Sequence, residues 1–235
     1  TMIGFGMAML VSGAAFAQQP AVTLQDAFGN TVAQAGVPVT VSFASGSGTF
    51  LGATTVSTSA GGVATFSGLG ISGLAGSYTL RFSSTGLTAA TSGTITLSAG
   101  AASALTLQAG NNQSATVNTA VGVLPAVKVT DAAGNPVSGV AVTFAVASGG
   151  GSVSGGSALT NGSGIASPVT WARGTTAGSN TLTATSAGLA GSPITFTATA
   201  SGCSTGDGLQ LALSAECGGN FIAINPGAPG GAALP

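Results

Sequence analysis

The stretch VKVTDAAGNPVSGVAVTF, residues 127–144, decides the fold. On both sides of a short polar turn, large apolar residues alternate with small or polar ones, which is the period of a half-buried β-strand. Val140, Val142 and Phe144 mark the second of these runs. In the turn, Gly and Asn suit a positive φ, and the Asp131 carboxylate can accept backbone N–H bonds. We therefore interpret Asp131 as a turn residue between two strands, and not as a catalytic acid or ligand.

The same pattern occurs twice in the chain. DAAGN at 131–135 is matched by DAFGN at 26–30, so Asp26 is also interpreted as a turn residue. Four more blocks recur in the same order at a nearly constant shift of about 100 residues: GVPVT at 36–40 with GVAVT at 139–143, GVA at 62–64 with GIA at 164–166, AGSYTL at 75–80 with AGSNTL at 177–182, and GL at 86–87 with GL at 188–189. We expect an all-β chain of two copies of one domain, over 20–100 and 101–200, with an extension at 1–19 and a tail at 201–235.

The pattern resembles the bacterial immunoglobulin-like domains of the invasin and intimin type. The resemblance is carried by residues 127–144, by GIA at 164–166 and by AGSNTLTAT at 177–185, and it covers about residues 20–200. The first copy departs from the pattern at Thr31, where Pro is expected, and by two extra residues between Val32 and Gly36. The resemblance implies two tandem β-sandwiches of roughly a hundred residues each, as in surface adhesins and other extracellular structures. It implies no catalytic residues.

Charged residues are almost missing from this sequence. The 235 residues include 3 Lys or Arg, 4 Asp or Glu and no His, whereas about one quarter of an ordinary soluble domain is charged. Three cations form no basic patch, which argues against nucleic-acid binding. Without His and with two Cys, neither the common metal sites nor the Ser-His-Asp and Cys-His catalytic groups can be built. We expect no enzyme, metal, cofactor or membrane span, and a protein at the cell surface or outside the cell.

The N-terminal extension has two interpretations. Its apolar core ends in AFA at 15–17, as in a secretion signal cleaved before Gln18, but no Lys or Arg precedes Arg81. We favour a strand whose large apolar residues share one face, because small residues separate most of them. Such a strand either completes its own domain or inserts into a neighbouring subunit. In the second case, the intersubunit anchors are Ile3, Phe5, Met7, Met9 and Val11.

The C-terminal tail belongs to neither copy. Alternating Leu residues at 209–213 and an apolar run at 221–224 predict a short hairpin. We expect a disulfide between Cys203 and Cys217, although two free buried thiols are the alternative. Asn112 and Asn161 each begin an Asn-x-Ser sequon and are candidate glycosylation sites.

These features predict a structural protein. The interpretation that we favour is a subunit of an extracellular, pilus-like filament, in which copies of the chain assemble head to tail by strand exchange. The alternative is a stalk or spacer fragment of an invasin/intimin-type adhesin, with cell-surface or matrix ligands as partners. The near absence of charge supports assembly, because neutral surfaces repel one another little.

Overall fold

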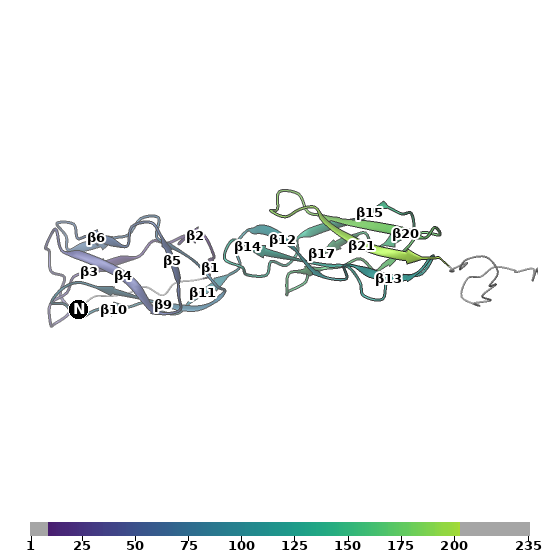
Figure 1. The fold of residues 1–235 in the computed structure, drawn as a ribbon. Coiled ribbons are helices and arrows are strands. Elements are labelled where there is room, and N and C mark those ends of the chain that lie inside the picture. Colours follow the sequence, from purple (N-terminus) through teal and green to yellow (C-terminus); the bar gives the residue numbers. More distant parts are fainter. Residues whose placement is uncertain (1–8, 203–235) are drawn as a thin grey trace, which may run out of the picture.

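The computed structural model describes residues 9–202 as two β-sandwiches joined end to end (Figure 1). Every regular element in this range is a strand. The all-β, immunoglobulin-like fold class expected from the sequence is therefore confirmed. Within the same range, no helix is long and apolar enough to cross a membrane.

The first sandwich contains strands β1 to β11. One layer has the order β1-β11-β9-β4-β6, with β10 also paired to β9, and the other layer consists of β2-β8-β5 and β3-β7. The strands are β1 (Leu10–Val11), β2 (Ala14–Ala15), β3 (Ala21–Thr23), β4 (Pro38–Ser45), β5 (Gly48–Leu51), β6 (Thr55–Ser57), β7 (Val63–Thr65), β8 (Gly70–Gly73), β9 (Gly76–Ser83), β10 (Ala90–Thr91) and β11 (Ile95–Ser98).

The second sandwich contains strands β12 to β21. One layer has the order β13-β21-β20-β15-β17, and the other consists of β12-β14-β18 and β16-β19. The strands are β12 (Ala102–Ala109), β13 (Gln113–Thr116), β14 (Ala126–Asp131), β15 (Ala141–Ser148), β16 (Ser152–Ser154), β17 (Ser157–Leu159), β18 (Ile165–Ala166), β19 (Thr170–Ala172), β20 (Gly178–Thr185) and β21 (Ile194–Ser201).

The two sandwiches share the main strand pairings of one layer. In each, a short early strand pairs in parallel with the last strand, β1 with β11 and β13 with β21. In each, the long central strand pairs with the same two neighbours, β4 with β6 and β9, and β15 with β17 and β20. The repeat seen in the sequence is therefore a repeat of structure.

The period-two pattern places one side of each strand in a core. Val39 and Val41 of β4 are buried, as are Val142 and Phe144 of β15, while the residues between them are exposed. Each sandwich has its own hydrophobic cluster, and Trp171 is fully buried in the second. Hydrophobic burial on this scale is the main force that stabilises a domain.

Hydroxyl groups take the place of charges on the outer faces of the sheets. Exposed Ser and Thr side chains on neighbouring strands hydrogen-bond each other, as in Thr40 with Thr55 at 2.9 Å and Ser148 with Thr181 at 2.7 Å. Such cross-strand pairs stabilise a sheet modestly and are neutral. The low charge of the sequence therefore corresponds to strand surfaces covered by hydroxyls.

The first sandwich begins earlier than the sequence predicts. Residues 10–19 were expected to belong to an extension, but Leu10 and Phe16 are buried in the first core. The backbone of β1 pairs with β11, and that of β2 pairs with β8. Parallel pairing joins strands that are distant in the chain, so local periodicity gives no sign of it.

Candidate functional site: the joint between the sandwiches

The turn that follows β14, called here the second turn (residues 131–135), is held by one carboxylate. Asp131 Oδ1 accepts hydrogen bonds from the N–H groups of Ala133 (2.9 Å) and Asn135 (2.8 Å), and Oδ2 accepts from the Asn135 side chain (2.8 Å). Asp131 is therefore a turn residue, as predicted. Of the Gly and Asn expected to adopt positive φ, only Gly134 does, at 90°. Asn135 instead uses its side chain to bind Asp131 and the first sandwich.

The second turn docks on a loop of the first sandwich, called here the first loop (residues 73–75). The Asn135 side-chain amide donates to the Gly73 carbonyl at 2.9 Å, and its oxygen accepts from Ala75 N–H at 2.8 Å. Asp131 Oδ2 also accepts from Gly100 N–H at 2.7 Å, in the segment that connects the sandwiches. Asn135 is 3% exposed. Two side chains thus tie the turn, the connecting segment and the first sandwich together.

The joint changes the acidity of Asp131. Burial alone would raise the pKa of Asp131, but hydrogen bonds from Asn135, Gly100 and Ala133 outweigh burial and hold this pKa below its ordinary value. Asp131 is therefore ionised at neutral pH, and the charge is shared among backbone and amide donors. A carboxylate bound in this way accepts stronger hydrogen bonds than a neutral group would.

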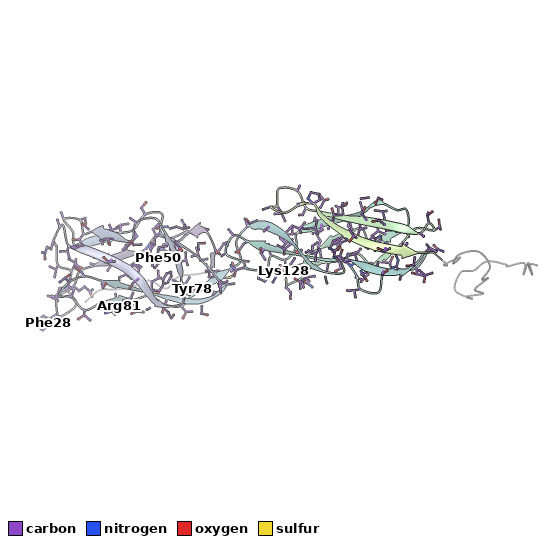
Figure 2. The ribbon with its side chains drawn as sticks, in the orientation of Figure 1. Phe28, Phe50, Tyr78, Arg81 and Lys128 are labelled. Carbon is purple, nitrogen blue, oxygen red and sulfur yellow. The ribbon has the colours of Figure 1, made fainter. Side chains whose placement is uncertain are left out.

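The first sandwich carries the same turn at its opposite end, called here the first turn (residues 26–30). Asp26 accepts from Phe28 N–H and Asn30 N–H at 2.9 Å and from the Asn30 side chain at 3.0 Å. These bonds, first among them that from the Asn30 side chain, lower the pKa of Asp26. Asn30 is exposed, and Phe28 is 91% exposed at the tip of the rod (Figure 2). The Asn of this turn sequence is therefore buried at a joint in one copy and exposed at an end in the other.

A cavity lies at the end of the second sandwich that is far from the joint (Figure 1). Its volume is about 470 Å³, and it lies between residues 149–151 and the segment that leads into β20, called here the second loop (residues 174–178, the last of which begins β20). The second loop corresponds to the first loop, because AGS at 177–179 matches AGS at 75–77. Arg173 lies beside the cavity, where its Nη2 donates to Thr119 Oγ1 (2.7 Å) and to the Ala120 carbonyl (2.8 Å).

The predicted strand anchors are only partly within the described residues. Ile3, Phe5 and Met7 lie outside them. Met9 is 78% exposed and Val11 is half-exposed, whereas Leu10, between them, is 4% exposed and packs in the core of its own sandwich. Within the chain, the buried face of β1 is thus the one opposite to the predicted face. Contact of these anchors with a second subunit stays a prediction.

The other predicted sites have mixed positions. Cys203 and Cys217 lie outside the described residues, so their disulfide also stays a prediction. Asn112 and Asn161 are both exposed in loops. Asn112 accepts a hydrogen bond from Thr197 Oγ1 at 2.6 Å. Glycosylation of Asn112 and Asn161 stays a prediction. In residues 9–202, no group of three or more His, Cys, Asp or Glu could hold a metal ion.

Sequence reasoning missed the joint itself. It identified the turns at 26–30 and 131–135 but treated them as equivalent, although only the second is buried against another sandwich. The position of the second turn in the sequence was a usable signal. After the connecting segment the chain runs away from the first sandwich, and β14 brings it back, so the turn that follows β14 lies at the joint. Arg173 gave no signal in the sequence.

Comparison with known proteins gave matches among solved structures only, since no family model and no curated protein matches the chain. The chain is similar to the D0-D1 domain of intimin (21% identity, 84% of this chain and 94% of that one, TM-score 0.31). It is also similar to the Escherichia coli adhesin FdeC (26%, 84% and 63%, TM-score 0.48) and to Yersinia pseudotuberculosis InvD (21%, 84% and 57%, TM-score 0.44). The chain thus spans less than two thirds of FdeC and of InvD. Other matches include a β-glycosidase from Bacteroides vulgatus (14%, 77% and 22%, TM-score 0.34). The intimin, FdeC and InvD structures contain immunoglobulin-like domains of the invasin and intimin type.

Proposed function

We propose that the chain is a spacer segment of a cell-surface adhesin, in which two immunoglobulin-like sandwiches keep a binding part at a distance from the cell. The observation that carries this proposal is the joint, where Asp131 and Asn135 are buried and hydrogen-bonded to both sandwiches. A spacer needs length and a fixed angle between domains. The two sandwiches supply the length, and the joint supplies the fixed angle. FdeC is described as an adhesin, and we extend that role to this chain as part of the proposal.

The surface of the described residues suits such a spacer. The outer strand faces carry paired hydroxyl groups, and the sequence holds 7 charged side chains (3 cationic and 4 anionic). A neutral, hydroxylated rod interacts weakly with charged molecules around it, so it does not compete with the binding part. The proposal places the protein at the cell surface and assigns it no catalysis.

The test is a surface display experiment. The chain is inserted between an outer-membrane anchor and a small binding domain of known target, and capture of target-coated beads by whole cells is measured. We expect more capture with the spacer than without it, and less gain when Asn135→Ala loosens the joint. Asn161→Ala, which removes an exposed amide whose hydrogen bonds stay within its own turn, is the control and should behave as the unchanged chain.

Two results would contradict the spacer role. One is saturable binding of the purified chain itself to host cells or matrix proteins, since the chain would then be a binding part. The other is equal capture with and without the chain at similar surface amounts.

A further inference from the structure

Both halves of the internal joint occur a second time, one at each end of the rod. The second turn (131–135) docks on the first loop (73–75) inside the chain. The first turn (26–30) repeats the docking turn at the far end of the first sandwich, where Figure 2 labels Phe28. The second loop (174–178) repeats the receiving loop at the start of β20, at the far end of the second sandwich (Figure 1). The two far ends of the described sandwiches are therefore of opposite type.

The first turn is preformed for docking. Asp26 holds it with the same three hydrogen bonds that Asp131 makes within the second turn. At its tip, Phe28 is 91% exposed, where the second turn has the half-buried Ala133. Single exposed apolar residues are common on protein surfaces. Here, however, the residue projects from a motif whose other copy has its Asp and Asn side chains buried at a joint.

The second loop lies beside a cavity that is open to solvent. Its volume of about 470 Å³ is bordered by glycine-rich backbone and by Arg173. Arg173 is 1% exposed, and its buried Nη1 has no hydrogen-bond partner among the described residues. No described carboxylate forms an ion pair with it, although a buried guanidinium is usually paired. A guanidinium is stabilised by contact with an aromatic ring, such as that of Phe28, and by a nearby carboxylate, such as that of Asp26.

We propose that two copies of this chain dock head to tail, with the first turn of one copy on the second loop of the next. Phe28 enters the cavity beside Arg173 of the other copy, and the Asn30 amide pairs with loop backbone as Asn135 does at the internal joint. The contact joins two different surfaces, so it can continue from copy to copy. It requires no strand exchange, and it does not rest on the spacer role.

The contact between free copies is expected to be weak. Inside the chain, the connecting segment keeps the two halves of the joint at high effective concentration, whereas separate copies lack this advantage. The electrostatic attraction between Asp26 of one copy and Arg173 of the next is small. Arg81, which is also cationic, lies toward the same end as Asp26 and offsets it (Figure 2). A concentrated solution of the chain is therefore needed to populate the contact.

Disulfide trapping tests the proposal in the full chain. Cys203→Ser and Cys217→Ser first remove the native thiols, and Asn30→Cys with Ala177→Cys then places one thiol in each half of the contact. We expect a ladder of oligomers on a non-reducing gel after mild oxidation at high protein concentration. The positive control is Ala75→Cys with Asn135→Cys, which should form a bond within one chain, because Ala75 N and Asn135 Oδ1 are 2.8 Å apart.

Two further variants set the background and identify the contact. Asn30→Cys with Leu159→Cys, a thiol at an exposed site on β17, measures random trapping. Adding Phe28→Ala to the trapping pair should reduce the ladder about tenfold, as expected for losing one buried apolar side chain. Adding Leu107→Ala, a change at another exposed site, should leave it unchanged.

The proposal is overturned if the positive control closes while the trapping pair gives no more oligomer than the random pair. It is also overturned if Phe28→Ala leaves the ladder intact. Neither result touches the spacer role, which depends on the internal joint alone.

Discussion

Replacing Asn135 by Ala is expected to free the two sandwiches from their fixed angle. The change removes both hydrogen bonds that the Asn135 side chain makes across the joint, to Gly73 and from Ala75. A neutral hydrogen bond contributes about 0.5–1.5 kcal/mol net, so the closed joint loses about 1–3 kcal/mol. This corresponds to a shift of about 5- to 150-fold in the equilibrium between closed and open joints. Water can replace the lost partners once the joint opens, which keeps the cost within this range.

Distances between spin labels measure the effect directly. With both native cysteines replaced by Ser, labels at Thr96 of β11 and Thr106 of β12 lie on opposite sides of the joint at exposed positions. Pulsed electron resonance should give one narrow distance distribution for the parent and a broad one for Asn135→Ala. Each sandwich should keep its own unfolding transition, because neither core is changed.

Asn30→Ala is the matched control. It removes the equivalent side chain from the first turn, where the amide bonds only to Asp26 among the described residues. Its distance distribution should equal that of the parent at micromolar concentration. The reasoning is refuted if Asn135→Ala leaves the distribution as narrow as in the parent, since packing or the connecting segment would then hold the angle.

The remaining predictions concern pH, strand register and backbone conformation. The pKa of Asp131 in the folded protein lies below its unfolded value of about 3.8, so the Asp131 carboxylate stabilises the joint fully above that pH and loses this effect as pH falls through the folded pKa. The distribution of distances between the spin labels should therefore broaden below about pH 4, and it should broaden less in Asp131→Asn. Leu10→Ala should lower the melting temperature of the first sandwich by the equivalent of about 2–4 kcal/mol, while Met9→Ala should change it little, because only the former is buried. Gly62→Ala should destabilise that sandwich by calorimetry far more than Gly29→Ala: both have positive φ, but the new Cβ meets backbone only at Gly62.

Much of the fold could be predicted because it is written in local patterns. Alternation at Val142 and Phe144 specifies a strand with one buried face, and the repeat of DAxGN specifies two copies of one unit. The hydrogen bonds of Asp131 within its turn were also predictable, since they join residues four or fewer positions apart. Interactions this short in sequence depend little on the rest of the molecule.

The register of the N-terminal strand could not be predicted in the same way. Alternation of large and small residues groups Met9 with Val11, yet Leu10 is the residue that enters the core. The choice is made by the parallel pairing of Leu10 with Leu97, which lies far away in the chain. A one-residue change of register exchanges the two faces of a strand, so only the partner strand decides between them.

The sequence by itself determined the all-β class, the two-fold repeat and the carboxylate hydrogen bonds within both turns, since each depends on neighbouring residues. Only the tertiary structure decided that Asn135 is buried at a joint while Asn30, in the same local motif, faces solvent. The two motifs make the same bonds within themselves and differ in what lies opposite them. That difference is set by how the connecting segment places one sandwich on the other, and no local pattern contains it.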